Sequence, residues 1–381
     1  MSSAPCCNAS APNRASFLLH VRKNFCNAPF DFRPSSCLQC RRRRWNGVAH
    51  LHGKPGGTMW DATPLPRTEI LALDDGSRDD SGKILEVLAH TWPKQDAPAL
   101  RVVHLPHGGI VSALNHGLYL AQGVLIARMD ADDHCHPQRL ALQYAYLAAT
   151  PDVDVCATRV FFGGDPATAC GFSYFVNWQN SLCSPDDIRD ARFRDTPVCH
   201  PTVLFRRSLV DRLGAYRHGN FAEDWELWLR WLDAGVRFCK LPQPLYLWND
   251  PPQRLTRTDA RYDSDANNAL RACWLRREWQ RRAPERLYVW GAGRMARRRL
   301  TKLWDETVRP TAFIDIDPKK IGQQIRHING PPVPVIAPAS LPAARDDFLL
   351  FNALTAHGAA EQAAFWLESH GWHQGRHWLL T

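Results

Sequence analysis

The sequence lacks any long apolar run. None approaches the roughly 18 consecutive apolar residues that a membrane-spanning helix needs. The stretch FLLHV near the start is also shorter than the core of about 7 to 15 apolar residues in a signal peptide. The sequence therefore predicts a soluble cytoplasmic protein, with peripheral contact to the inner face of a membrane as an open alternative.

Negative charge is scarce at the start of the chain. Residues 1–68 hold ten Lys or Arg against Asp31 and Asp61, a net of +8 out of the +9 of all 381 residues. The remaining 313 residues therefore carry only +1. Their composition gives no electrostatic reason to expect a nucleic acid partner, and a chain of this length predicts two domains.

The same first residues show no regular hydrophobic period. Residues 1–68 are dense in Pro, Gly, Cys and Arg, whereas the later cysteines are scattered singly, as reduced thiols are. We therefore predict an irregular, basic, Cys-rich head that is either disordered or translated from a shifted frame or a misassigned start. Two alternatives for the head are a zinc site and an anion-binding arginine run. Their residues are Cys37, Cys40, His50 and His52, and Arg41 to Arg44.

From Glu69 onward, strand and helix patterns alternate. Apolar runs such as EILALDD and VLIARMD are typical of strands, and the segments between them show helical spacing. This alternation predicts a mostly parallel α/β sheet, in which ligands bind beyond the carboxyl ends of the strands. Both runs end in aspartate, so acidic side chains are expected at that edge.

Three carboxylates, Asp130, Asp132 and Asp133, follow the second of these strands. Alternate residues of an extended chain point the same way, so Asp130 and Asp132 are spaced to bind one hard divalent cation. Such a cation can neutralise a leaving phosphate group. The alternative is a solvated turn that caps the next helix. A second acidic strand end, Asp74 and Asp75, favours the ligand site.

Glu223 and Asp224 begin an apolar helix, AEDWELWLRWLDAG, after a Gly-Asn turn. A carboxylate at this position commonly caps the unpaired backbone amides of the first turn. It can instead act as a general base. Both interpretations stay open for these residues.

Four motifs in order carry a family resemblance. They are EILALDDGS, GGIVSALNHGLYLAQGVLIARMDADDHCHPQRLALQ, CHPTVLFRR and GNFAEDWELWLRW. They resemble, over residues 69–258, the nucleotide-sugar glycosyltransferases of family 2, which have the GT-A fold. The resemblance implies an inverting, metal-dependent transfer from a nucleotide-sugar, expected to be a UDP-sugar. It implies as acceptor a glycan or a lipid-linked molecule in bacterial cell-surface polysaccharide biosynthesis.

The resemblance also implies roles on the donor side. Asp75 would contact the nucleotide base, and Arg128, Asp130 and Asp132 would bind the nucleotide-sugar. Asp132 would be the main ligand of Mn²⁺ or Mg²⁺, with Asp130 as the second.

On the acceptor side, the resemblance implies that Asp224 is the base that deprotonates the acceptor hydroxyl. His200, Glu223 and Arg206 are expected near the acceptor or the diphosphate. The segment PLYLWNDPPQRLTRTDARY, residues 244–262, looks like the corresponding tail of bacterial members and is expected to pack beside the acceptor site.

One part of the family pattern is not found in its expected place. Members begin with an apolar strand and a Pro-x-Tyr-Asn-like turn that walls in the nucleotide base. The nearest apolar stretch here, SFLLHVRKNF, lies much earlier and lacks the turn. Loss of that strand would open one side of the pocket and expose a sheet edge. A transferase-like relic without turnover is therefore the rival prediction, and the presence of the first strand decides against it.

The C-terminal part carries a partial dinucleotide fingerprint. Gly291 and Gly293 lie between a strand and a helix in LYVWGAGRMARRRL, and Asp315 ends the next strand 24 residues after Gly291. We predict a small Rossmann-like unit that packs rather than binds. A second nucleotide site at these three residues, or an NAD(P)-linked function, is the alternative.

The predicted fold is α/β, a GT-A domain followed by a small Rossmann-like domain. The predicted segments are an irregular head at 1–68, the GT-A domain at 69–258, a helical Arg-rich connector at 259–285 and the Rossmann-like domain at 286–381.

Overall fold

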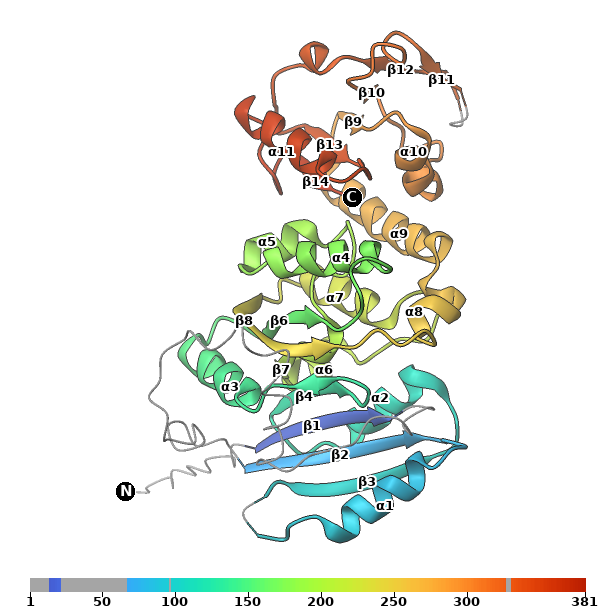
Figure 1. The fold of residues 1–381 in the computed structure, drawn as a ribbon. Helices are drawn as coiled ribbons and strands as arrows, with labels where there is room; N and C mark the ends of the chain where they lie inside the picture. The colour runs from blue at the N-terminus through green and yellow to red at the C-terminus, as the bar shows by residue number, and fades with distance from the viewer. Residues whose placement is uncertain (1–13, 22–66, 96, 327–329) are drawn as a thin grey trace, which may run out of the picture. The chain divides into compact units, whose positions relative to one another are not determined.

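The computed structural model describes residues 14–21, 67–95, 97–326 and 330–381. Strands and helices alternate along them (Figure 1), which confirms the expected α/β class. The chain divides into two compact units, and each is described by itself. The first unit holds residues 1–168, 199–215 and 241–249, and the second holds 169–198, 216–240 and 250–381. The division does not follow the predicted boundary at residue 258, because two earlier segments group with the C-terminal residues.

The first unit is built on a mixed sheet. Its strands are β1 (Arg14–Val21), β2 (Arg67–Asp75), β3 (Ala99–Leu105), β4 (Leu125–Asp130), β5 (His134–Cys135), β6 (Val155–Phe162), β7 (Leu204–Arg206) and β8 (Phe238–Trp248). They lie in the order β3-β2-β1-β4-β7-β6-β8-β5. The first four pair in parallel, whereas β7 is antiparallel to β4 and β5 is antiparallel to β8. The expected mostly parallel, mixed sheet is therefore confirmed.

The strand expected to be missing is present. β1 lies between β2 and β4 and runs parallel to both, with His20 opposite Leu73 on one side and opposite Asp130 on the other. The prediction that the head contributes no element was therefore wrong for residues 14–21. A shifted reading frame is no longer needed to explain this part of the head. The alternative zinc and arginine sites lie outside the described residues.

Helices accompany this sheet. They are α1 (Ser81–Thr91), α2 (Gly109–Leu120), α3 (Arg139–Ala149) and α6 (Ser208–Leu213), with a 3-10 turn, η5 (His200–Thr202), before β7. At Gly117, α2 comes so close to the sheet that an added Cβ would lie 2.5 Å from the Leu73 side chain and 3.3 Å from that of Leu18. Glycine at this position therefore allows α2 to pack on β1 and β2.

The second unit contains a six-stranded sheet. Its strands are β9 (Arg286–Trp290), β10 (Ala312–Ile314), β11 (Gln324–Ile325), β12 (Val333–Ile336), β13 (Phe348–Asn352) and β14 (Trp378–Leu380). They lie in the order β11-β12-β10-β9-β13-β14, and all neighbours but β11 and β12 are parallel. The order of the parallel strands is the doubly wound pattern expected of a Rossmann-like unit.

Some of the helices of the second unit share a core with this sheet. The helices of the unit are α4 (Cys170–Ser181), α5 (Pro185–Ala191), α7 (Glu223–Asp233), α8 (Leu255–Thr258), α9 (Ser264–Arg282), α10 (Arg294–Leu300) and α11 (Ala359–Ser369). Trp225 of α7 and Leu275 of α9 belong to the same buried cluster as Val289 and Phe313 of the sheet. The C-terminal sheet therefore supports the helix that carries Glu223 and Asp224.

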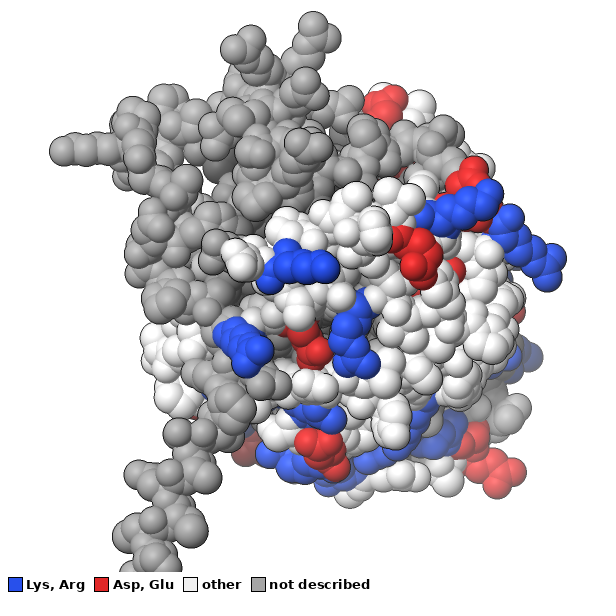
Figure 2. Space-filling view, turned by 90° about the horizontal axis from the view of Figure 1, so that it is seen from below, with Lys and Arg blue, Asp and Glu red and all other residues white. Residues whose placement is uncertain are grey.

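The surface of the described residues carries mixed charge. On the face that Figure 2 shows, basic and acidic side chains are interspersed among other residues. Among the helices of the described residues, none has the length and apolarity to cross a bilayer.

Candidate functional site

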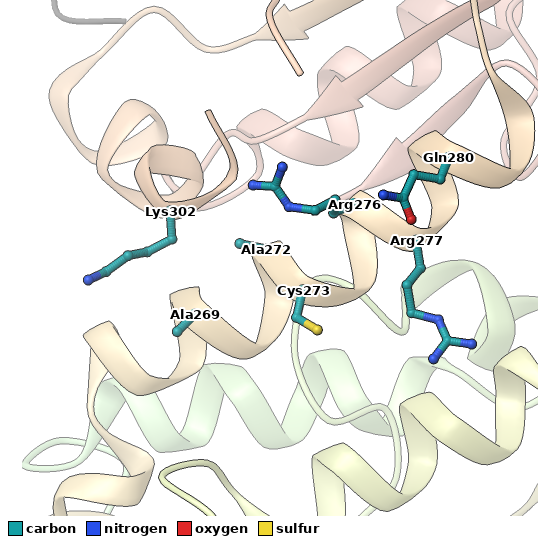
Figure 3. Close-up of a pocket in the computed structure, with 7 residues that line it drawn as sticks. All are labelled: Ala269, Ala272, Cys273, Arg276, Arg277, Gln280 and Lys302. Carbon is teal, nitrogen blue, oxygen red and sulfur yellow. The ribbon is translucent and has the colours of Figure 1, made fainter. Parts of the chain in front are cut away.

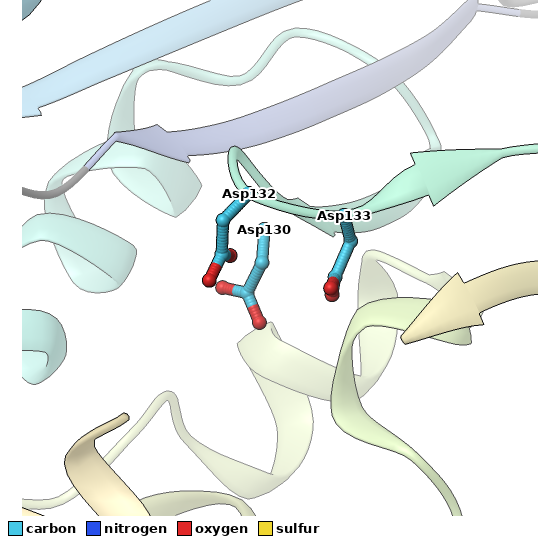
Figure 4. A group of neighbouring side chains, drawn as sticks. All are labelled: Asp130, Asp132 and Asp133. Atoms are coloured by element: carbon cyan, nitrogen blue, oxygen red, sulfur yellow. The ribbon is translucent and has the colours of Figure 1, made fainter. Parts of the chain in front are cut away.

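Three carboxylates gather in the turn after β4, and we name Asp130, Asp132 and Asp133 the acidic turn. The buried strand β4 ends at Asp130, and the other two follow directly (Figure 4). One oxygen from each carboxylate lies within 4.8 Å of those of the other two. Asp133 is buried, Asp130 is half-buried and Asp132 is exposed. The acidic turn therefore offers hard oxygen donors at the carboxyl end of a strand, where the sequence predicted a cation site.

A buried arginine lies behind the acidic turn. Arg128 is 3% exposed, and its Nη1 lies 2.6 Å from Oδ2 of Asp130. The guanidinium of Arg128 offsets part of the repulsion among the carboxylates and fixes one oxygen of Asp130. Arg128 was expected to bind the nucleotide-sugar, and this stays a prediction, since the structure shows only that its charged end contacts Asp130.

Asp133 is held by β8 and the residues that follow it. Its Oδ2 accepts a hydrogen bond from the Tyr246 hydroxyl at 3.0 Å, and its Oδ1 accepts one from the Asn249 N–H at 2.8 Å. Burial, followed by the charges of Asp133 and Asp130, raises the pKa of Tyr246 well above its usual value. The phenol is therefore a neutral donor at physiological pH.

Asp75, at the end of β2, is engaged by the start of α2. Its two carboxylate oxygens accept hydrogen bonds from the N–H groups of Gly108 and Gly109, at 2.8 and 3.0 Å. Gly76 follows with φ of +66°, and an added Cβ there would lie 2.7 Å from the His107 nitrogen. The expected base-contacting residue thus also fixes the loop before α2, and the glycine makes the close approach possible.

Asp74, beside it, is 4% exposed and part of a carboxylate–imidazole chain. Its Oδ2 lies 2.9 Å from Nδ1 of His104, whose Nε2 lies 2.5 Å from Oε1 of Glu86. Its hydrogen bonds to the carboxylates, first to Asp74 and then to Glu86, raise the pKa of His104 above its usual value. The imidazole therefore links β2, α1 and β3, and its two carboxylate partners favour its protonated form.

The register of the sheet brings the two acidic strand ends to one edge. Val21 at the end of β1 is opposite Asp74 of β2, and His20 is opposite Asp130 of β4. Since β1 alone separates β2 from β4, the backbones of the two acidic ends lie about 10 Å apart, which is two strand spacings. Carboxylates distant in the sequence therefore border the same stretch of this edge.

The CHPTVLFRR motif is divided between the two ends of β4. Val203 accepts a hydrogen bond from the Arg128 N–H, so His200, which is 6% exposed, lies toward the acidic turn. Arg206 is opposite Leu125, five residues before Asp130, or about 17 Å along the strand. It donates a hydrogen bond to the Leu147 carbonyl instead. Arg206 therefore lies away from the acidic turn, and its expected place near the acceptor or the diphosphate stays a prediction.

In the second unit, Glu223 and Asp224 form the first turn of α7. Asp224 is half-buried, and its Oδ1 accepts a hydrogen bond from the Trp225 N–H at 2.7 Å. Glu223 is 3% exposed, and its Oε2 accepts a hydrogen bond from the Tyr262 hydroxyl at 2.5 Å. Tyr262 therefore fixes the residue next to the candidate base.

The chain matches a known protein family over part of its length. Residues 59–214 match the model described as Glycosyl transferase family 2. This segment belongs to glycosyl transferase family 2. The family expected from the four motifs is thereby confirmed, and the matched residues include Asp75 and the acidic turn. The match begins after β1 and ends before Asp224, so the structure alone supplies the strand between β2 and β4.

Several curated proteins resemble the family 2 domain. AmsE of Erwinia amylovora, named an amylovoran biosynthesis glycosyltransferase, is 30% identical over 184 residues, which are 48% of this chain and 64% of the relative. WbnJ of Escherichia coli, named an O-antigen biosynthesis glycosyltransferase, is 26% identical over 181 residues, which are 46% and 66% of the two chains. The chain spans about half to two thirds of the length of the first relatives that it matches.

Two solved structures resemble the chain at a lower level. TarS of S. aureus, solved in complex with UDP-GlcNAc, is 15% identical with a TM-score of 0.44, covering 70% of this chain and 72% of that one. The mannosyltransferase PcManGT of Pyrobaculum calidifontis, in complex with GDP-Man and Mn²⁺, is 19% identical with a TM-score of 0.40, covering 70% and 63%. At these TM-scores, the likeness carries no argument about the function of this chain.

Behind the family 2 segment, the fingerprint residues of the Rossmann-like sheet come together. Gly291 has φ of +120°, and an added Cβ there would lie 2.8 Å from that of Ala296. Gly293 caps α10, and the N–H of Ala292 between the two glycines donates to Oδ2 of Asp315 at 3.2 Å. The fingerprint therefore joins the first turn of α10 to the strand ends.

Asp315 accepts hydrogen bonds from three donors of the chain. It is 8% exposed, and besides the Ala292 N–H it accepts hydrogen bonds from the Asp317 N–H at 3.0 Å and from Lys320 Nζ at 3.1 Å. In a dinucleotide site the acidic residue here hydrogen-bonds a ribose. Here the donors of the chain itself occupy those positions.

A hollow on α9 is a further concave surface of the second unit (Figure 3). Its lining residues are Ala269, Ala272, Cys273, Arg276, Arg277, Gln280 and Lys302. Arg276 forms an ion pair with Asp305, and Arg277 forms one with Asp233. These cations are therefore committed to the chain, and the hollow does not contribute to the candidate site.

Sequence analysis missed Tyr246, Asn249 and Tyr262 as individual residues. All three lie in the segment 244–262 that was expected to pack beside the acceptor site. The aromatic residues of that segment, next to a Pro-rich turn, were the only signal. Nothing local revealed that Asp133 and Glu223 are their partners.

Proposed function

We propose that the protein is an inverting, metal-dependent glycosyltransferase that moves a sugar from a nucleotide-sugar, a UDP-sugar, to a hydroxyl of a glycan or lipid-linked acceptor. The setting proposed is the biosynthesis of a cell-surface polysaccharide, as in the names of the relatives AmsE and WbnJ. The observation that supports the proposal most is β1, which completes the sheet between the two acidic strand ends.

The rival reading, an inactive relic, depended on the absence of that strand. With β1 paired along both neighbours, the sheet has no gap between β2 and β4. The edge at which Asp75 and the acidic turn lie is therefore continuous. This continuity favours a working donor pocket over a relic.

The acidic turn has a donor set that fits Mn²⁺ or Mg²⁺. Asp132 is exposed. Asp130 contacts Arg128 through its Oδ2. We infer that Asp132 is the main ligand and Asp130 the second, with the diphosphate of the donor supplying further oxygens. A bound divalent cation would stabilise the negative charge that develops on the leaving nucleoside diphosphate.

We infer that residues of the chain itself accept the proton and contact the substrates. Asp224 would accept the proton of the acceptor hydroxyl as its oxygen bonds to the anomeric carbon. The bond from that carbon to the diphosphate breaks, and its electron pair leaves with the nucleoside diphosphate. Attack opposite the leaving group inverts the configuration. Asp75 would contact the nucleotide base, and His200 would lie near the acceptor or the diphosphate.

We infer a packing role for the Rossmann-like sheet. The three donors on Asp315 occupy the acceptor that a ribose would need, and the sheet shares a core with α7. The sheet would thus support the helix of the candidate base. Tight binding of NAD(P) or of a second UDP would contradict this inference.

Calorimetric titration of UDP into the full chain, with and without Mn²⁺, tests the proposal. We expect binding that requires Mn²⁺, followed by UDP release when UDP-sugars are supplied with saccharide acceptors. No heat in either condition from a chain shown to be folded would refute the donor site.

A further inference from the structure

The residues at the end of β8 form a scaffold under the acidic turn. The Tyr246 hydroxyl accepts a hydrogen bond from the Asp130 N–H at 3.2 Å and donates one to Oδ2 of Asp133 at 3.0 Å. A single buried hydroxyl therefore bridges the first and the last residue of the turn.

Asn249 makes two more contacts with the same turn. Its backbone N–H donates to Oδ1 of Asp133 at 2.8 Å, and its side-chain amide donates to the carbonyl of Asp132 at 2.5 Å. The strand pairing continues beyond the turn, where His134 is opposite Leu247. Each residue of the acidic turn is thus bound to β8 or to the residue that follows it.

Asp133 differs from its two neighbours in this scaffold. It is 6% exposed, and each of its oxygens accepts a hydrogen bond from a separate donor. A carboxylate whose two oxygens already accept hydrogen bonds in a buried site is poorly placed to ligate a cation at the surface. Asp132 is exposed, by contrast, and Asp130 reaches the sheet edge.

We propose that Tyr246, Asn249 and Asp133 are positioning residues that set the geometry of the Asp130–Asp132 pair, and that Asp133 is not itself a metal ligand. This inference rests on the proposed function, because it specifies the roles within the same cation site. The physical reason is repulsion. Three carboxylates within 4.8 Å of one another would spread apart in a turn that nothing anchored. Hydrogen bonds from β8 hold the backbone of the turn, so Asp130 and Asp132 can bind the cation without further ordering of the turn.

The test is Mn²⁺ affinity in the presence of UDP, measured on the full chain by calorimetry and by the spin resonance of free Mn²⁺. Tyr246→Phe keeps the buried ring and removes the bridging hydroxyl. We expect it to weaken Mn²⁺ binding about 10- to 100-fold, which is typical when an outer partner of a metal ligand is removed. Asp133→Asn should give a loss of the same size. Tyr119→Phe, at an 80% exposed position of α2, should leave the affinity unchanged.

Asn249→Ala is the variant least able to disturb the fold, since its side-chain contact is exposed while its N–H to Asp133 is retained. We expect a several-fold loss of Mn²⁺ affinity. Each variant should keep the circular dichroism spectrum of the unaltered chain, which a general loss of structure would not allow.

The outcomes separate this inference from the proposed function. If the unaltered chain shows no Mn²⁺-dependent UDP binding, the proposed function fails. If that binding is present but Tyr246→Phe and Asn249→Ala retain full Mn²⁺ affinity, the scaffold has no positioning role. If Asp133→Asn loses as much as Asp132→Asn while Tyr246→Phe loses little, Asp133 is a ligand and the inference is wrong.

Discussion

The two sheets of the chain carry aspartates at the same topological position, the carboxyl ends of parallel strands, but surround them differently. In the first unit, β4 leads into three carboxylates, with Arg128 as the basic partner of Asp130. In the second unit, β10 leads into Asp315, which receives one lysine and two backbone N–H groups. The first site therefore has three carboxylates beside one arginine. In the second, Asp315 is held by two backbone N–H groups and by Lys320, which also pairs with Asp317.

We infer from this difference that a strand end can bind a ligand only where it has more polar groups than the chain itself already pairs. In both units, aspartates lie at the carboxyl ends of parallel strands, where ligands bind in open α/β sheets. In the Rossmann-like sheet, however, Lys320 already pairs with Asp315 at 3.1 Å. In the acidic turn, β8 satisfies Asp133 and leaves Asp132 exposed.

The largest expected effect contrasts Asp132 with Asp315. Asp132→Asn removes the charge of the proposed main ligand, so Mn²⁺-dependent UDP binding and transfer should fall by about 10³-fold or more, the equivalent of several kcal/mol of charge stabilisation. Asp315→Asn should leave UDP binding and transfer intact, and lower the free energy of unfolding by about 1–2 kcal/mol through its weakened hydrogen bonds. Calorimetry and urea unfolding measure the two quantities.

Equal effects of these two variants on transfer would break the comparison. A large loss of transfer in Asp315→Asn, with stability unchanged, would mean that the second sheet holds a ligand after all. Thermal melting of both variants serves as the control for folding.

The next effect concerns turnover rather than binding. Asp224→Asn cannot accept the proton of the acceptor hydroxyl, so kcat should fall about 10²- to 10³-fold, within the range that general bases contribute. The affinity for UDP with Mn²⁺ should not change. Asp233→Asn, at the other end of the same helix, is the matched control. A loss of donor affinity in place of kcat would assign Asp224 to the donor.

Sequence alone predicted the fold class because periodicity is local. The alternation of strands and helices and both Gly-rich and acidic strand ends were readable without a structure. β1 was missed since its membership depends on parallel pairing with β2 and β4, which lie far along the chain. The eight residues RASFLLHV are apolar only at their centre, and their neighbours gave no strand signal.

The site was predicted only where spacing carries the information. Asp130 and Asp132 were identified by their alternation, but Tyr246 lies 113 residues from its partner Asp133. Arg206 follows His200 closely in the sequence, yet it lies opposite Leu125 at the start of β4, a separation that the motif alone did not reveal.

A smaller effect compares the buried arginines of the two units. Arg139, at 0% exposure, donates to the carbonyl of Arg128, and Arg271, at 3%, donates to those of Phe193 and Arg194. Replacing either by Met removes these hydrogen bonds to buried carbonyls and should lower the free energy of unfolding by about 3 kcal/mol. Only Arg139→Met should also weaken Mn²⁺ affinity, because its partner lies in β4. Unfolding in urea and Mn²⁺ titration check this, and weakened Mn²⁺ binding in Arg271→Met would contradict it.

The smallest effect is a pH dependence confined to the first unit. Asp74 and Glu86 raise the pKa of His104, so the pair stabilises the fold below the unfolded histidine pKa of about 6.5. That stability is lost as the pH rises through the higher folded value. The unfolding free energy of the unaltered chain should therefore exceed that of His104→Gln at pH 5.5 and approach it by pH 9. With the His104 side chain 45% exposed, the difference should stay below about 1 kcal/mol.

The pKa of Asp74 is shifted in the opposite direction, and this shift determines the pH range of the measurement. Burial alone would raise its pKa, but hydrogen bonds from Ser77 and His104 lower it below its usual value. Its contribution is therefore present above the unfolded carboxyl pKa and is lost only as the pH falls, so urea titrations held above pH 5 isolate the histidine. Glu86→Gln removes one of the two carboxylates and should retain part of the pH dependence. A difference between the unaltered chain and His104→Gln that grows with rising pH would mean that the imidazole is neutral in the folded chain, and the carboxylate–imidazole chain would then be an ordinary hydrogen bond.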